Sequence, residues 1–86
     1  MISRNELKDR RDAMVRAERE AREKATIAFV EDVLKAVAES DEAVRKGYVD
    51  IVFSGYEHSE KAGIEYLRAY GYYPALLHDH TYHIEW

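Results

Sequence analysis

The fold is decided by one unbroken stretch, SRNELKDRRDAMVRAEREAREKATIAFVEDVLKAVAE, which occupies residues 3–39 of the 86-residue chain. It contains no Gly or Pro and consists mainly of Ala, Arg, Glu and Lys, which have high helix propensity. Ser3 can cap the first turn, Glu6 completes a capping box, and Ile2 and Leu7 have the spacing of a hydrophobic staple. The stretch therefore predicts a single long helix.

The two halves of this helix differ in the apolar surface that they can bury. The second half has a wide apolar face, typical of a helix that packs on a core and formed by Ile27, Val30, Val33, Leu34, Val37 and, beyond the helix, Val44. The first half has a narrow stripe with a seven-residue repeat, formed by Leu7, Met14, Ala21 and Ala28, with Ala17 and Ala25 beside it. The stripe is compatible with a helix–helix contact or with a solvated helix, because Arg10 and Arg11 occupy positions that a full heptad would fill with apolar residues.

The second part of the chain predicts shorter elements. Alternating apolar residues over 48–53 predict a half-buried strand. Residues 59–70 predict a second helix, which Ser59 can cap at its start and Gly71 can close at its end.

The chain closes with a predicted hairpin of residues 72–78 and 81–86, turning at Asp79 and His80. In this register Ala75 faces Ile84, and one face is apolar, consisting of Tyr73, Ala75, Leu77, Tyr82, Ile84 and Trp86. The opposite face holds Pro74, Leu76, His78, Thr81, His83 and Glu85.

The predicted fold is α+β: a long N-terminal helix, then strand, helix and hairpin, with the strands in a three-stranded antiparallel sheet of order 1-3-2. Pro74 favours this order because proline lacks the N–H group that a central strand needs, so its strand belongs at an edge. We expect a single domain over residues 1–86. Residues 26–86 form its α+β core, and residues 1–25 form a protruding, charged half of the helix.

Composition and charge exclude several classes of protein. The absence of Cys excludes disulfides and thiolate metal sites, and no stretch is apolar enough for a membrane span or a secretory signal, which favours the cytoplasm. Residues 1–46 carry 11 basic and 11 acidic side chains, whereas residues 47–86 carry only Lys61 and Arg68 against six acidic ones. Nucleic-acid binding is therefore not expected.

No arrangement of residues matches a known catalytic motif, so we expect neither an enzyme nor a cofactor. Three histidines, His78, His80 and His83, lie close together near the C-terminus. His78, His83 and Glu85 share one face of the predicted hairpin and form an alternative divalent-metal site. The simpler interpretation is the solvated face of a hairpin.

Two candidate binding surfaces remain. The loop after the first strand and the rare cation of the C-terminal half suggest contacts with a ligand or partner, at Tyr56, Glu57, His58, Arg68 and Tyr72. The protruding half of the helix suggests self-association as a dimer or small symmetric oligomer, through Leu7, Met14, Ala17 and Ala21.

Three short motifs carry a resemblance to a known class of proteins. Gly47-Tyr48 leads the first strand, Tyr70-Gly71-Tyr72 ends the second helix, and Ile84-Glu85-Trp86 closes the chain. Together with the charged N-terminal helix, this pattern resembles small accessory proteins of tailed bacteriophages, although Pro74 and Tyr70 depart from it. The resemblance implies a viral protein in the host cytosol, from a class that includes inhibitors of host or defence proteins.

The expected function is therefore that of a small non-enzymatic oligomeric viral accessory protein, which binds and inhibits a host or defence protein. The alternative is a ligand-sequestering protein that traps a nucleotide signal between its subunits.

Overall fold

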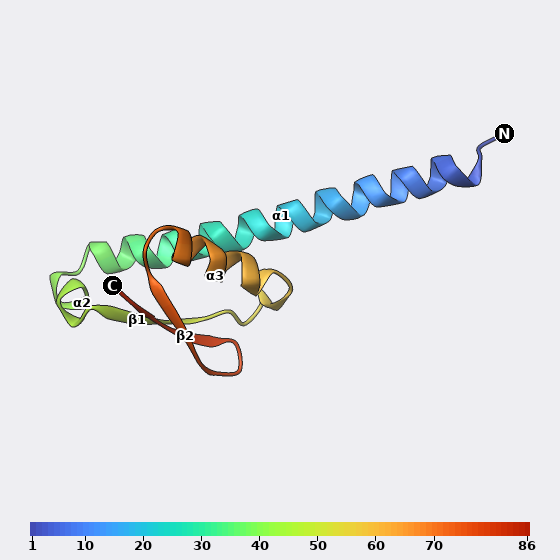
Figure 1. The fold of residues 1–86 in the computed structure, drawn as a ribbon. Coiled ribbons are helices and arrows are strands. Elements are labelled where there is room, and N and C mark those ends of the chain that lie inside the picture. The colour runs from blue at the N-terminus through green and yellow to red at the C-terminus, as the bar shows by residue number, and fades with distance from the viewer.

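The computed structural model describes all 86 residues. Its longest element, helix α1, spans Arg4–Ala38 and confirms the predicted long helix. Ser3 caps the helix, since its hydroxyl oxygen accepts the backbone N–H of Glu6 at 3.2 Å. The N-terminal end of α1 extends far beyond every other element (Figure 1), and the molecule measures 64 × 25 × 21 Å.

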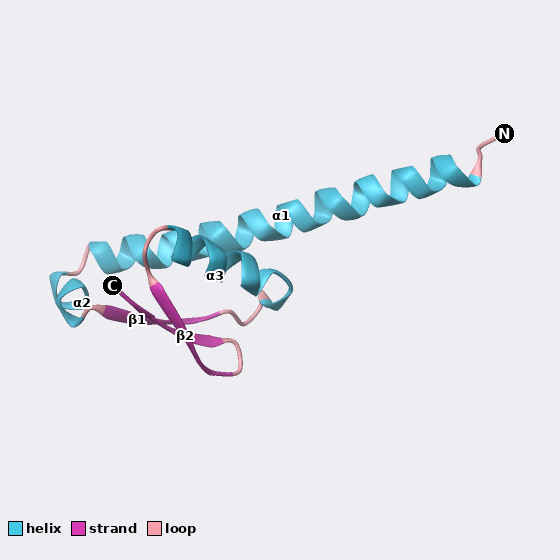
Figure 2. Cartoon of the chain, viewed as in Figure 1, coloured by secondary structure: helices cyan, strands magenta, loops and turns pink.

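The remaining elements follow in short connections (Figure 2) and are α2 (Asp41–Lys46), β1 (Tyr48–Val52), the 3-10 turn η1 (Glu57–Ser59), α3 (Glu60–Ala69), β2 (Tyr73–His78) and β3 (Thr81–Glu85). The strands form one antiparallel sheet of order β1-β3-β2, which confirms the predicted topology. Strand β2, with Pro74, lies at an edge as expected.

Helix α3 begins after Ser59 and ends before Gly71 as predicted, but its first turn lacks the expected side-chain cap. Gly71 has a φ of 89°. Its N–H donates to the carbonyl oxygen of Arg68 at 3.1 Å, and the N–H of Tyr72 donates to that of Leu67 at 3.0 Å, which is a Schellman motif. Ser59, the predicted cap, makes no capping hydrogen bond with its side chain. Its hydroxyl is buried and directed at α1 instead.

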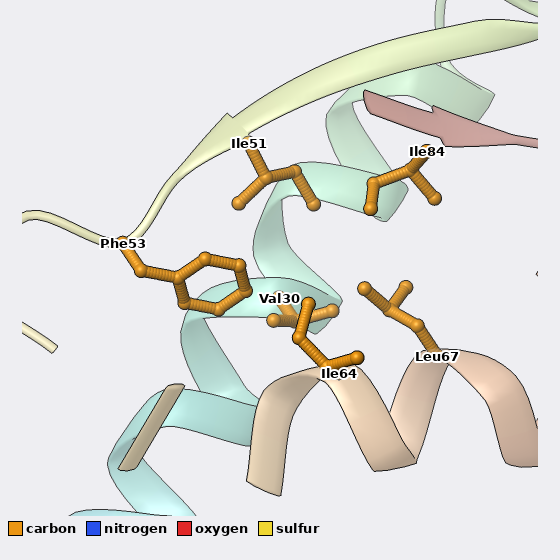
Figure 3. Packing of buried hydrophobic residues seen from close by; sticks show 6 residues of the cluster. All are labelled: Val30, Ile51, Phe53, Ile64, Leu67 and Ile84. Carbon is orange, nitrogen blue, oxygen red and sulfur yellow. The ribbon is translucent and has the colours of Figure 1, made fainter. Parts of the chain in front are cut away.

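The hydrophobic core lies between the sheet and the two longer helices. Figure 3 shows side chains from α1, from α3 and from the sheet side converging on one space, and the six that are fully or nearly buried are Val30, Ile51, Phe53, Ile64, Leu67 and Ile84. Helices α1 and α3 therefore cover one face of the sheet. The residues Tyr48, Asp50, His83 and Glu85 belong to its other face.

The core-facing side of α1 is rotated slightly from the predicted one. Val30 is fully buried, and Val33 and Leu34 pack against the core as predicted. Thr26 and Phe29, which the apolar pattern did not single out, belong to the same side. Val44, predicted to join this face, is 46% exposed.

The predicted register of the hairpin is wrong along most of β2. His78 pairs with Thr81 as predicted, but Ala75 pairs with His83, and Pro74 pairs with Ile84. A β-bulge between Leu76 and His78 inserts one residue and shifts the rest of the strand. Pro74 and Leu76 therefore share the face of Ile84 and Tyr82, while Tyr73 and Ala75 belong to the open face of the sheet.

A small polar cluster joins α1 to the start of α3. The hydroxyl groups of Thr26 and Ser59 are hydrogen-bonded to each other, and both lie within hydrogen-bond distance of the backbone carbonyl oxygen of Arg22, at 3.0 Å and 3.2 Å. Both side chains are buried. Because every buried side-chain polar atom has a partner, the cluster fixes the position of α3 on α1 without leaving a polar group unsatisfied.

Candidate functional site

The N-terminal part of α1, residues 4–25, is called the protruding half of α1 below. No side chain before Thr26 is buried, and three large apolar side chains lie in the open: Leu7 at 56%, Met14 at 64% and Val15 at 55% exposure. Leu7, Met14 and Val15 line a shallow hollow together with Arg10, Arg11 and Glu18. The interface predicted through Leu7, Met14, Ala17 and Ala21 is therefore a continuous exposed surface in the single chain.

A second exposed apolar surface lies at the opposite end of the molecule and is called the apolar groove below. It encloses about 370 Å³ and is lined by Leu34, Val37, Ala38, Val44, Tyr70, Gly71, Tyr72 and Trp86. The C-terminus lies beside α2 (Figure 1), and the indole N–H of Trp86 donates to the carbonyl oxygen of Val44 at 3.3 Å. The groove is thus assembled from the ends of α1 and α3, from α2 and from the last residue.

The groove walls are aromatic and partly exposed. The rings of Tyr72 and Trp86 meet edge to face with centroids 6.2 Å apart. Tyr70 is 69% exposed and Trp86 is 40% exposed, so both rings offer surface to another molecule. Among the lining residues, the sequence singled out only Tyr72 as a binding contact. No local sequence signal marks the others, because they come from separate segments that only the fold brings together.

The structure does not bring the five predicted ligand-contact residues together. Tyr56, Glu57 and His58 belong to the turn before α3, whereas Arg68 and Tyr72 belong to its other end. Arg68 is exposed, and Tyr72 lines the apolar groove.

Tyr56 and Glu57 have structural partners in this turn. The ring of Tyr56 stacks on that of Phe29 of α1, with centroids 4.5 Å apart and planes at 12°. Hydrogen bonds from the backbone N–H groups of Gly55 and Glu57 lower the pKa of the Glu57 carboxyl. The side chain of His58 borders a polar hollow with Arg19, Glu23 and Lys61.

On the open face of the sheet, His83 is held between two carboxylates. Its Nδ1 lies 2.8 Å from an oxygen of Asp50, and its Nε2 lies 3.1 Å from an oxygen of Glu85. Carboxylates accept hydrogen bonds and do not donate them, so the imidazole satisfies both when it carries both protons. The hydrogen bond with Asp50 is the largest cause of a raised pKa for His83, and the Tyr48 ring lies 4.7 Å from the imidazole.

This arrangement predicts a pH dependence of stability. Because the pKa of His83 is raised in the folded state from 6.5, its contribution is fully present below 6.5 and is lost as the pH rises through the folded pKa. We expect wild type to exceed the His83→Gln variant in melting temperature at about pH 5.5, with the difference shrinking towards about pH 8.5. A thermal unfolding series at constant ionic strength measures this difference. A difference independent of pH would contradict the proposed charge state.

The residues of the alternative metal site, His78, His83 and Glu85, do not form a metal-binding group in the structure. His78 lies opposite Thr81 in the sheet, whereas His83 lies opposite Ala75 and uses both ring nitrogens for Asp50 and Glu85. No group of three or more His, Cys, Asp or Glu side chains is arranged to hold a metal ion. His80 pairs separately with Glu60, at 3.1 Å.

Two further findings concern the chain as a whole. No helix is both long enough and apolar enough to cross a membrane. No protein-family model, curated protein or solved structure matches this chain.

Proposed function

We propose that the protein is a non-enzymatic binding protein that self-associates through the protruding half of α1 and holds a partner protein at the apolar groove. The observation that carries this proposal is the groove itself. Seven of its eight lining residues are hydrophobic, and the aromatic rings of Tyr70 and Trp86 are exposed at it. Exposed aromatic pockets of this kind hold the anchoring side chains of protein interfaces.

The chemistry of the groove favours a protein segment over a nucleotide. None of its eight lining side chains carries a charge, so it has no cation to neutralise phosphate groups. A volume of about 370 Å³ is at the low end of the range for ligand pockets, about 300–1,000 Å³, and suits one or two large apolar side chains. The expected occupant is therefore an apolar or aromatic anchor of a partner protein.

The resemblance to accessory proteins of tailed bacteriophages supports a bacterial host or defence protein as this partner. Binding without catalysis would then act by inhibition, through occupation of a surface that the partner needs.

The test uses two valines with nearly equal exposure as a matched pair. Val44 lines the groove and is 46% exposed, while Val52 lies at the end of β1 and is 50% exposed. In quantitative affinity capture from a bacterial lysate, we expect Val44→Glu to reduce recovery of the partner at least about tenfold, because it buries an unpaired charge at the contact. Val52→Glu should capture as wild type does.

Two results would overturn this function. One is equal recovery of every captured protein by wild type and Val44→Glu, with both variants folded by circular dichroism. The other is a rise in melting temperature of several degrees with a nucleotide in place of a protein, which would support the nucleotide-sequestering alternative.

A further inference from the structure

The exposed stripe on the protruding half of α1 is bulky at one end and small at the other. Leu7 and Met14 occupy its N-terminal part, whereas Ala21 and Ala28 occupy its C-terminal part. The flanking residues follow the same trend, with Arg10 near the start and Ala17 near the end. Such a stripe fits best against a copy of itself that runs in the opposite direction, because Leu7 at the bulky end then meets an alanine at the small end of the second copy.

We propose that two copies of the chain pair through the protruding halves of α1, antiparallel, about a twofold axis at Met14. This inference rests on the self-association proposed above and adds its geometry. Leu7 then lies opposite Ala21 of the second copy, and the two Met14 side chains meet at the axis. The interface is isologous, since both copies use the same surface.

Charge complementarity selects this register. Arg11 and Glu18 lie on the same flank of the stripe, four residues after Leu7 and four residues after Met14, respectively. With the axis at Met14, Arg11 lies beside Glu18 of the second copy, and the symmetry repeats this ion pair. A shift by one heptad in either direction would place Arg11 against Arg11 or Glu18 against Glu18, which is repulsive.

Basic residues on the other flank of the stripe, opposite Arg11 and Glu18, disfavour a parallel pair. Arg10 and Lys24 lie there at equivalent heptad positions, and in a parallel pair each would face its own copy. In the antiparallel pair, the aliphatic stem of Arg10 instead covers Ala17 of the second copy. Glu18 already contacts Arg22 of its own helix at 3.7 Å, so the pairing with Arg11 would extend an existing network.

The second copy has an open path along α1. Val30, which faces the core, comes sixteen residues after Met14 in the sequence, and at 100° per residue this places it about 160° around the helix axis from the stripe. Ala21 and Ala28 are accordingly exposed although the core begins at Thr26. The pairing therefore needs no rearrangement of the sheet or of α3.

This geometry places the two apolar grooves at opposite ends of an elongated dimer. From Met14 to Ala38, at about 1.5 Å per residue, is roughly 36 Å, so the two helix ends lie about 70 Å apart. Such a dimer is bivalent and can hold two partner molecules without contact between them. It could also link two sites of one large assembly.

Complementary charge variants of the full chain test the geometry. Arg11→Glu places two carboxylates side by side at both symmetry-related contacts, and Glu18→Arg places two guanidinium groups there. Each variant alone is expected to dissociate at least about tenfold more readily than wild type. An equimolar mixture forms a heterodimer in which one contact joins the two substituted positions, with their charges exchanged, and the other contact joins the unchanged Arg11 and Glu18. Its light-scattering mass should therefore return to that of wild type.

Charge reversals on the far side of the helix serve as matched controls. Arg16→Glu and Glu23→Arg alter residues about 200° and 180° around the axis from Met14 and should keep the wild-type mass. Dissociation of both test variants without recovery in the mixture would overturn the antiparallel geometry and leave self-association through α1 standing. A wild-type mass for both test variants would place the interface elsewhere. A single-chain mass for wild type would overturn self-association as well.

Discussion

Replacement of Phe53 by alanine is expected to lower the free energy of unfolding by about 3–5 kcal/mol, the largest effect of any single truncation in this chain. Phe53 follows β1 and is fully buried, and its ring meets the rings of Phe29 and Tyr82 edge to face, at 6.0 Å and 5.6 Å. It therefore joins α1, the sheet and α3 at one point. Domains of this size are stable by only about 5–15 kcal/mol, so the variant would lose much of its stability.

Urea unfolding followed by circular dichroism measures this loss. Tyr73→Ala is the matched control, because it also truncates an aromatic side chain, but one that is 71% exposed on the edge strand. We expect the control to change the free energy of unfolding by about 0.5 kcal/mol or less. A loss below about 1 kcal/mol in Phe53→Ala would contradict the central place of this ring in the core.

Gly63→Ala is expected to destabilise the protein by about 1–3 kcal/mol, although alanine favours the helix by about 1 kcal/mol. Gly63 lies inside α3, where an added Cβ would lie 2.8 Å from Cε1 of Phe53 and 3.1 Å from Cγ2 of Thr26. Both neighbours are fully buried, and side chains in close-packed interiors can shift only at a cost. Steric overlap therefore outweighs the gain in helix propensity.

A double variant separates these two effects. Phe53→Leu removes the ring atoms nearest to Gly63, so adding Gly63→Ala in that background should cost at least about 1 kcal/mol less than in wild type. Equal costs in the two backgrounds would show that the ring is not the obstacle.

Local sequence was sufficient to predict the two longer helices, the three strands and their order. The uninterrupted helix formers and the Ser3 cap predicted α1, because both act within a few residues. Pro74 predicted which strand lies at the edge, and Gly71 predicted the end of α3. These features are decided by backbone geometry that each residue imposes on its own neighbourhood.

The register of β2 could not be predicted because two constraints act on the strand from opposite ends. The Asp79-His80 turn fixes the face of the sheet on which His78 lies. The Schellman end of α3 fixes the face on which Tyr72 lies, because Tyr72 packs against the core. The alternation of side chains set from the two ends differs by one residue, and the bulge between Leu76 and His78 accommodates this extra residue. No single residue indicates this conflict, because it arises only when both ends of β2 are fixed in the fold.

The two proposed binding surfaces also differ in how far the sequence alone predicts them. The stripe on α1 could be read from its seven-residue spacing, since a helix fixes which residues share a side. The apolar groove could not, because its walls come from α1, α2, the end of α3 and the last residue of the chain. The role of Ser59 could not be predicted from local sequence either, because its hydroxyl bonds to Thr26 of α1 instead of capping α3.

The solution mass of the full chain tests whether the protruding half of α1 is an interface with a second copy, as proposed. Light scattering across a concentration series should give two chains of 10.1 kDa at high concentration, with dissociation on dilution. A mass of one chain at every concentration would contradict the claim, because nothing else in the molecule covers Leu7 and Met14.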